Sequence, residues 1–167
     1  MSHNLEKLQA LIDRAHELAP VRVAVACAAQ LVLLETLRDA TLVGLVVPRL
    51  VGDRDTILSL GRDLDWKIDP DWVIAAATDT EVASLAVRMV RRGEADVLMK
   101  GNLHTDVLMR AVLDSDFGLR SAGRRCSHIF LLDVPDHDRL IGITDAAINI
   151  APDLAAKGHI CQNAIDL

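Results

Sequence analysis

The sequence has few aromatic residues and no excess of positive charge. Among 167 residues there are two Trp, two Phe and no Tyr, and 24 acidic residues outnumber 18 basic ones, which gives a formal charge of −6. Proteins that bind single-stranded nucleic acid stack bases on aromatic rings, and phosphate backbones are bound by basic surfaces. The composition therefore argues against nucleic acid as a partner.

Cysteine is also scarce. Cys27, Cys126 and Cys161 lie far apart in the chain, so their spacing indicates neither a disulfide framework nor a zinc ribbon. The N-terminus lacks the basic and then apolar run of a signal peptide, and no apolar stretch approaches the length of a membrane span. We therefore expect a cytoplasmic protein with no membrane partner.

Apolar runs alternate with segments of helical periodicity through the first 115 residues, in a composition that is 51% hydrophobic and 25% charged. The periodicity predicts helices at residues 4–19, 30–40, 53–63, 78–93 and 105–115, and strands at residues 21–28, 42–47, 72–77 and 95–99. Ser2 or Asn4 could cap the first helix, and Thr78 with Glu81 forms a capping box. Because the strands are apolar along their length, we predict an α/β fold, a parallel sheet with helices on both faces.

The alternation changes after residue 118. A basic loop that contains glycine is followed by two expected strands, 129–134 and 140–144, joined by a polar turn, and this pattern predicts an antiparallel pair. A last helix is expected at residues 152–166. We expect a first α/β domain at residues 1–120 and the start of a second domain at residues 121–167.

The turn that leaves the strand at 95–99 is the first candidate site. Ligands of parallel α/β sheets bind beyond the carboxyl ends of the strands. This turn brings Lys100 and Gly101 to that edge, and we expect Thr105 to cap the helix that follows. A helix N-terminus with a lysine and a glycine beside it outlines a phosphate cradle. The same residues also fit an ordinary strand end, turn and helix cap.

Arg110 lies on the polar face of the helix that Thr105 opens. Asp106 and Asp114 are four residues away on either side, so Arg110 could be a surface residue with two ion-pair partners. Alternatively, its guanidinium could hold a phosphate in a bidentate manner.

The second candidate turn runs over residues 144–153. An apolar strand leads there into Asp145, small residues and Asn149. This order fits a loop that faces a ligand, and it also fits a helix entry with a capping Asp or Asn and Pro152 in the first turn.

Two further clusters invite a chemical interpretation. Cys126 and His128 would share one face of a strand while Ser127 would not, so a Cys–His dyad is a minor alternative there. The acidic turn at residues 133–138 contains side chains of the kind that bind metals. Because no second group of such residues lies nearby in the sequence, a solvent-exposed turn is the better interpretation. We expect no metal site.

Six motifs occur in order along the chain. They are Ala-Asp-Val-Leu-Met-Lys-Gly at 95–101 followed by Thr105, Leu-Met-Arg-Ala-Val-Leu at 108–113, Gly-Leu-Arg at 118–120, Ser-His at 127–128, Thr-Asp-Ala-Ala-Ile-Asn-Ile-Ala-Pro-Asp at 144–153 and Gln-Asn-Ala at 162–164. Together they resemble the phosphate acetyl/butyryltransferase family, and its phosphate butyryltransferase branch most closely. The resemblance extends from about residue 21 to the end of the chain.

This resemblance implies a reversible acyl transfer in which acyl-CoA and inorganic phosphate give acyl phosphate and CoA, without a metal or redox cofactor. It also implies a fold similar to the isocitrate and isopropylmalate dehydrogenases, with two domains around a cleft, and a homodimer. It makes Arg110 the catalytic contact to phosphate. The residues that it assigns to the phosphate and CoA cleft are Lys100, Gly101, Thr105, Ser127, Asp145 and Asn149.

Members of that family are considerably longer, so the resemblance implies that this chain corresponds to their N-terminal half. The last helix has Ile160, Cys161, Ala164 and Ile165 on one side and no stop signal, so we expect its apolar face to need a partner. One alternative is a non-catalytic remnant that binds CoA or phosphate weakly. Another is a dehydrogenase-like or acyl-carrier-dependent phosphate acyltransferase, which the Lys-Gly to Thr spacing and the segment at 145–152 disfavour.

Overall fold

The structure is a computed structural model that describes residues 6–120, 123–135 and 137–167. By its internal contacts the chain divides into two units. The central unit is Leu18–Leu119, and the terminal unit combines the N-terminal helix with Arg120–Leu167. Within the described ranges, every helix is too short or too polar to cross a membrane.

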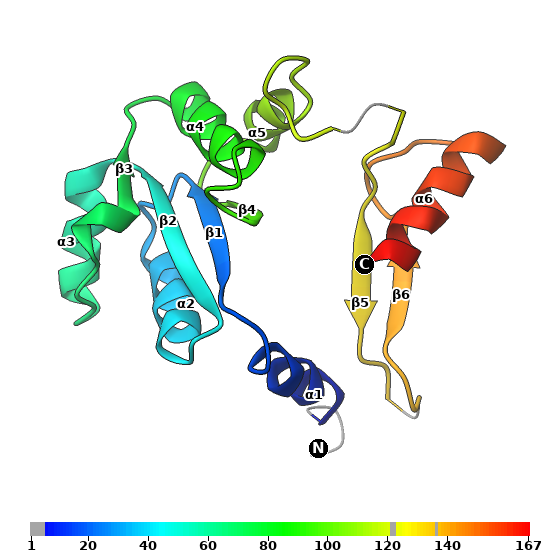
Figure 1. Ribbon diagram of the computed structural model, residues 1–167, viewed down its shortest axis with the longest axis horizontal. Helices are drawn as coiled ribbons and strands as arrows, with labels where there is room; N and C mark the ends of the chain where they lie inside the picture. Colours follow the sequence, from blue (N-terminus) through cyan, green and yellow to red (C-terminus); the bar gives the residue numbers. More distant parts are fainter. Residues whose placement is uncertain (1–5, 121–122, 136) are drawn as a thin grey trace. The chain divides into compact units, whose positions relative to one another are not determined.

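The central unit is built on a four-stranded parallel sheet (Figure 1). The strands are β1 (Val21–Ala26), β2 (Val46–Gly52), β3 (Val73–Ala75) and β4 (Val97–Lys100), in the spatial order β3-β2-β1-β4. Successive side chains of β1 point to opposite faces, so that Val23 and Val25 enter one core and Ala24 and Ala26 enter the other. The predicted parallel sheet, buried on both faces, is confirmed.

Two helices cover each face of this sheet. On one face, α2 (Leu31–Leu42) and α3 (Arg54–Asp63) contribute Leu34, Leu37 and Ile57 to the core. On the other face, α4 (Asp79–Arg91) and α5 (Thr105–Val112) contribute Val82, Ala86 and Leu108. A short 3₁₀ helix, η1 (Pro70–Trp72), leads into β3. The helices on both faces that the sequence predicts are therefore present.

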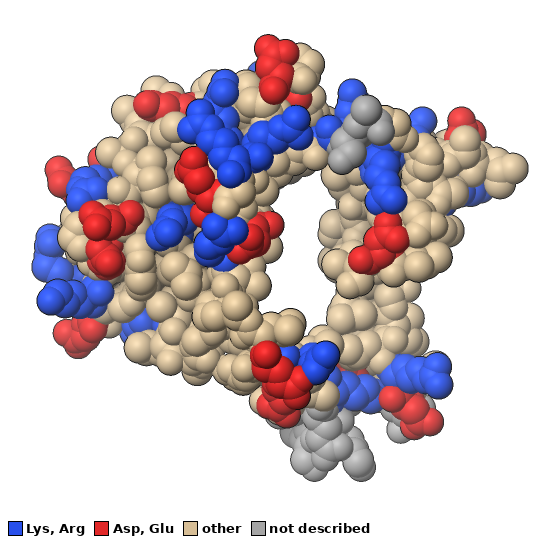
Figure 2. Space-filling view, in the orientation of Figure 1, with Lys and Arg blue, Asp and Glu red and all other residues tan. Residues whose placement is uncertain are grey.

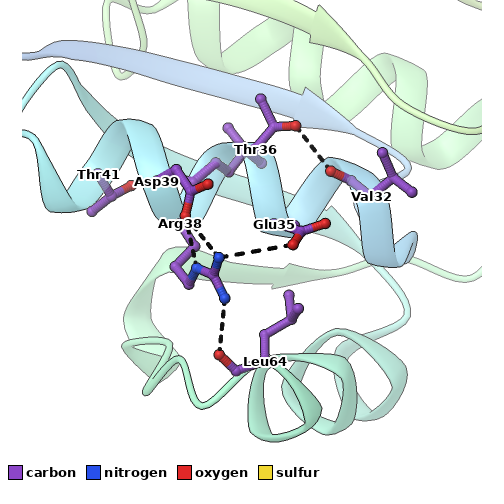
Figure 3. Close-up of polar contacts among 8 residues, drawn as sticks. Val32, Glu35, Thr36, Arg38, Asp39, Thr41 and Leu64 are labelled. Carbon is purple, nitrogen blue, oxygen red and sulfur yellow. Dashed lines mark hydrogen bonds and ion pairs between the residues drawn. The ribbon is translucent and has the colours of Figure 1, made fainter.

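Arg38 ties the two helices of the first face together (Figure 3). Its guanidinium donates to Oδ1 of Asp39 at 2.9 Å and to the carbonyl oxygen of Leu64 at 3.2 Å. Leu64 is the C-cap residue of α3. These polar groups of α2 serve packing between α2 and α3.

The second strand lies several residues later than the sequence interpretation placed it. It was expected at residues 42–47, but α2 continues to Leu42 and Gly44 turns the chain at a φ of 76°, so β2 begins at Val46. Pro48 is buried inside β2, in register with Val23. Proline lacks a donor for the sheet and is unusual in a central strand, so a strand that continues through it is hard to predict.

Helix α4 begins as its sequence predicts. The hydroxyl of Thr78 accepts from the backbone N–H of Glu81 at 3.2 Å, and the Glu81 carboxylate accepts from the N–H of Ala77 at 2.9 Å. The capping box is confirmed, with its return bond one residue earlier than usual. For α1 (Glu6–Ala15), the caps considered at Ser2 and Asn4 lie outside the described residues.

The terminal unit holds α1, a hairpin and a helix. Strands β5 (Ile129–Leu132) and β6 (Ile141–Thr144) pair in antiparallel fashion, as predicted, and α6 (Leu154–Asp166) packs beside β6 (Figure 1). The carboxylate of Asp153 caps α6 by accepting from the N–H of Ala156 at 2.7 Å. Pro152 therefore precedes the cap instead of standing in the first turn.

Candidate functional site

The carboxyl ends of β1 and β4 form the switch point of the central sheet. From β1 the chain builds β2 and β3 on one side and β4 on the other, and Ala26 of β1 is in register with Lys100 of β4. In open α/β sheets, ligands bind in the crevice outside the carboxyl ends of the strands at such a point. The predicted Lys100 and Gly101 lie at this position.

Gly101 allows two loops of the protein to touch. Its N–H donates to the carbonyl oxygen of Ala26 at 2.7 Å, and the N–H of Asn102 donates to that of Cys27 at 3.2 Å. A Cβ atom at Gly101 would lie 2.1 Å from the Cys27 oxygen, closer than real Cβ contacts. The side of Gly101 that lacks a side chain therefore faces the protein's own backbone.

The other groups at this edge are also engaged locally. The ammonium of Lys100 donates to the carbonyl oxygens of Leu103 at 3.0 Å and of Gly101 at 3.3 Å. Burial raises the pKa of the Cys27 thiol, and the Asp79 carboxylate acts in the same direction, while the Asn102 N–H and the Lys100 ammonium oppose them. A raised pKa keeps Cys27 in the thiol form near neutral pH, which makes it a poor nucleophile.

Thr105 is the first residue of α5, and the cap position belongs to His104. The prediction that Thr105 caps the helix is wrong. His104 supplies no side-chain hydrogen bond to the N-terminal amides of α5. The cap position holds His104 and not one of the usual capping residues Ser, Thr, Asp or Asn. The nearest hydroxyl residue, Thr105, therefore carries the only capping signal there.

Arg110 points to solvent. Its side chain is 81% exposed, and its guanidinium donates to Oδ2 of Asp106 at 3.0 Å, one helical turn earlier. The second carboxylate considered as a partner, Asp114, instead accepts from the N–H groups of Asp116 at 2.9 Å and Phe117 at 3.1 Å. Arg110 also lines a groove of about 250 Å³ between α4 and α5.

Further cations surround this part of the central unit. Figure 2 shows Lys and Arg side chains gathered over α4 and α5. Helix α4 carries Arg88 and Arg91 in its last turn. Arginine forks suit phosphate groups, so this side of the sheet offers an anion more cationic partners than Arg110 alone.

Asp145 organises the loop after β6 in the terminal unit. Its carboxylate accepts from the N–H of His128 at 3.0 Å, from the N–H of Asn149 at 2.7 Å and from the side-chain amide of Asn149. The Asn149 side chain, followed by the backbone N–H groups of His128 and Asn149, lowers the pKa of Asp145 far below its ordinary value, against the opposing effect of burial. Asp145 is therefore ionised at any physiological pH, with its oxygens turned to these donors.

Asn149 and Ser127 are held in the same framework. The amide of Asn149 donates to the carbonyl oxygen of Cys126 at 2.9 Å. The hydroxyl of Ser127 accepts from the side-chain amide of Asn163 on α6 at 2.9 Å, and Asn163 also donates to the carbonyl oxygen of Arg125. The structure thus brings Ser127, Asp145 and Asn149 together in the terminal unit.

The alternatives at residues 126–138 gain no support. The His128 ring packs edge-on against Phe130, with centroids 4.3 Å apart, and its Nδ1 atom is buried with no partner among the described residues. Asp133 pairs with Lys7 at 2.8 Å, and Asp136 lies outside the described residues. In the part of the chain that the structure describes, no three His, Cys, Asp or Glu side chains gather as a metal site would require.

Three contributors to these clusters are not apparent from sequence spacing. Asn163 reaches Ser127 across 36 residues, and Ser84 and Phe117 line the groove beside Arg110 from separate segments. A signal was present for Asn163, which stands in the Gln-Asn-Ala motif. No sequence motif marks Ser84 or Phe117 as part of a site. Ser84 on α4 and Phe117 after α5 meet only because α4 packs against α5.

A family model described as "Phosphate acetyl/butaryl transferase" matches residues 64–167. The chain belongs to this family. All seven predicted site residues lie within the matched segment. The resemblance inferred from the motifs is confirmed.

Phosphate acetyltransferases and phosphate butyryltransferases are both similar in sequence to this chain. It is 43% identical to the phosphate acetyltransferase of Rhizobium meliloti over 129 residues, which are 77% of this chain and 40% of that protein. It is 52% identical to a probable phosphate butyryltransferase of Bacillus subtilis over 93 residues, 56% of this chain and 31% of that protein. It is 36% identical to the phosphate butyryltransferase of Clostridium beijerinckii over 166 residues, 99% of this chain and 53% of that protein.

A solved structure has the same fold. A branched-chain phosphotransacylase from Enterococcus faecalis matches with a TM-score of 0.69 at 23% identity, over 87% of this chain and 50% of that protein. At 23% identity, this match supports a similar fold and nothing further. The chain spans about a third to a half of the length of the curated relatives it matches.

Proposed function

We propose that this chain carries phosphate- and CoA-binding residues of a phosphate acyltransferase of the acetyl or butyryl class, which converts acyl-CoA and phosphate into acyl phosphate and CoA. The observation that carries the proposal is the family match over residues 64–167, which contains Arg110 and all six predicted binding residues. Similarity to a phosphate acetyltransferase and to a phosphate butyryltransferase supports the reaction class.

The reaction needs a positioned phosphate. A phosphate oxygen attacks the thioester carbonyl carbon, the C–O bond forms, the C–S bond breaks, and the proton lost by the phosphate ends on the CoA thiol. Phosphate is a weak nucleophile in water, and fixing it against the carbonyl supplies a high effective concentration. Cations and N–H groups aimed at the tetrahedral oxyanion lower the barrier further.

Arg110 is the residue proposed to hold the phosphate. Its guanidinium is exposed and pairs with the Asp106 carboxylate, which an anion can replace. Lys100, Gly101 and Thr105 would line the same cradle at the end of β4 and the start of α5. A helix N-terminus with no side-chain cap favours an anion at this place.

Asp145 acts in this proposal through its neighbours. Its oxygens are turned to the His128 and Asn149 donors, and a carboxylate repels phosphate. We assign Asp145 to positioning the loop that carries Asn149, and Ser127 to contact with substrate through the hydroxyl that Asn163 orients. Self-association into a homodimer and a cytoplasmic location follow from the family resemblance and belong to the same proposal.

The test is CoA formation from butyryl-CoA or acetyl-CoA, followed as loss of the thioester, with and without phosphate. We expect phosphate-dependent loss of thioester, and Arg110→Ala should remove most of it. Arg62→Ala is the matched control, because Arg62 is an exposed arginine in the last turn of α3, on the other face of the sheet. The C. beijerinckii relative serves as a positive control.

Each outcome has a meaning. Turnover that Arg110→Ala leaves unchanged would refute the role of Arg110. No turnover, together with weak binding of CoA by calorimetry, would favour the non-catalytic alternative over a transferase formed by this chain alone.

A further inference from the structure

The groove between α4 and α5 has a mixed lining, of which the proposed function uses Arg110 alone. Val107 and Ala111 lie four residues apart and present one face of α5 to it, and Phe117 also lines it. Helix α4 supplies the hydroxyl residues Thr80 and Ser84. The groove therefore combines apolar side chains from one segment with hydroxyls from another.

The side of the groove formed by Phe117 is held in place by contacts within the protein. The Arg88 guanidinium lies 3.9 Å from the centroid of the Phe117 ring, and its Nε donates to the Ser84 hydroxyl at 3.2 Å. The N–H of Phe117 donates to Asp114. A Cβ atom at Gly118 would lie 2.3 Å from the carbonyl oxygen of Asp114, so the turn that carries Phe117 closes only around a glycine.

A fixed wall has an energetic consequence. A ligand that enters a preformed pocket does not have to order the side chains it meets, and less binding energy is lost. Phe117 is held both at its ring and at its backbone N–H, so the groove is built before any ligand arrives.

The size of the groove limits its ligand. Its volume of about 250 Å³ equals roughly eight water molecules at about 30 Å³ each. Ligand pockets for larger molecules begin near 300 Å³. A nucleotide is therefore too large, whereas a chain of a few carbons fits.

The charges around the groove indicate which end of a ligand enters. Val107, Ala111 and Phe117 offer an anion no donor, and the Asp114 carboxylate in the same lining repels one, whereas the lining side chain of Arg110 is 81% exposed. An elongated ligand with one apolar end and one anionic end would place the apolar end inside and the anion at Arg110.

We propose that this groove takes the acyl chain of the substrate and that Val107, Ala111 and Phe117 set the chain length. The inference rests on the proposed function, in which Arg110 holds the phosphate that attacks the acyl carbonyl. The carbonyl then lies at the mouth of the groove, and the hydrocarbon tail extends toward Phe117.

Two substitutions change the groove in opposite directions. Ala111→Leu fills it, and we expect binding of butyryl-CoA to weaken about tenfold relative to acetyl-CoA, because pockets discriminate single methylenes by about tenfold or more. Val107→Ala enlarges it, and binding of hexanoyl-CoA should strengthen several-fold relative to acetyl-CoA. Val112→Ala is the matched control, since Val112 lies on the same helix and packs against the same core without lining the groove.

Dissociation constants for the three acyl-CoAs are measured by calorimetry on the full chain, with circular dichroism to verify folding, and turnover is measured in parallel. Altered chain-length ratios in Ala111→Leu or Val107→Ala, with Val112→Ala unchanged, support the groove. Unaltered ratios in folded variants, or no acyl-CoA binding by the parent chain, overturn it. Altered binding ratios without any turnover would support the groove and refute a transferase formed by this chain alone.

Discussion

Gly101→Ala is expected to destabilise the central unit strongly. The added Cβ would lie 2.1 Å from the carbonyl oxygen of Cys27 and 2.8 Å from that of Ala26, so the two loops have to separate by about 1 Å. That separation breaks or stretches two hydrogen bonds, from Gly101 N–H to Ala26 and from Asn102 N–H to Cys27. These atoms are backbone, and no flexible side chain can move aside instead.

The magnitude follows from these contacts. Each lost hydrogen bond is worth about 1 kcal/mol, and overpacking in a tight site costs about 1–3 kcal/mol. The total of about 3–5 kcal/mol is a large part of the roughly 5–15 kcal/mol that stabilises a domain. At about 4–8 °C per kcal/mol, the melting temperature should fall by at least about 12 °C.

The scarcity of aromatics supplies a selective assay. Both tryptophans, Trp66 and Trp72, lie in the central unit, so tryptophan fluorescence during thermal unfolding reports that unit alone. Gly44→Ala is the control in the same unit: its Cβ meets nothing within 4 Å, and only the positive φ of 76° penalises it, by about 1–2 kcal/mol. An unchanged midpoint for Gly101→Ala, or one equal to that of Gly44→Ala, would refute the close-approach argument.

Two further predictions separate structural from chemical roles. Thr78→Ala removes the cap of α4 and should lower stability by about 1 kcal/mol in urea unfolding, whereas Thr105→Ala, which caps nothing, should change it by less than about 0.5 kcal/mol; equal losses would contradict this. The pKa of Asp145 is lower in the folded protein than its value of about 3.9 in the unfolded chain, so the ionised carboxylate stabilises the fold. This stabilisation is fully present well above pH 3.9 and is lost as the pH falls toward the folded pKa. Asp145→Asn should therefore lower stability at pH 7 and flatten its decline below about pH 4, measured by amide hydrogen exchange of the terminal unit; an unaltered acid profile would oppose this.

Elements with strong local signals could be predicted from the sequence. The capping box at Thr78 and Glu81 and the apolar stripe of α4 lie within one segment, and both are present. The extent of β2 could not be predicted, because the strand continues through Pro48, which is in register with Val23 on another strand. Local propensity decides an element until a contact distant in sequence overrides it.

In the candidate site, too, local features could be predicted from the sequence and distant contacts could not. The turns at the carboxyl ends of β4 and β6 are recognisable, since strands that lead into Lys100–Gly101 or Asp145 leave a local pattern. What each residue touches is not recognisable, because Gly101 contacts the loop of Cys27 and Ser127 contacts Asn163 on α6. These partners depend on the fold, so the sequence could suggest candidate residues without separating structural from binding roles.

Of Lys100, Gly101 and Arg110, the arginine is the one that an anion can recruit at least cost. Lys100 donates to two carbonyl oxygens and Gly101 is closed off by the Cys27 backbone, so phosphate binding at either has to displace existing contacts. Arg110 has only an exposed pair with Asp106, and such pairs contribute about 0–1 kcal/mol. Bidentate binding of a phosphate replaces that contact with stronger charge-assisted hydrogen bonds. The exposed position of Arg110 therefore favours a role in holding substrate over a role in holding the fold.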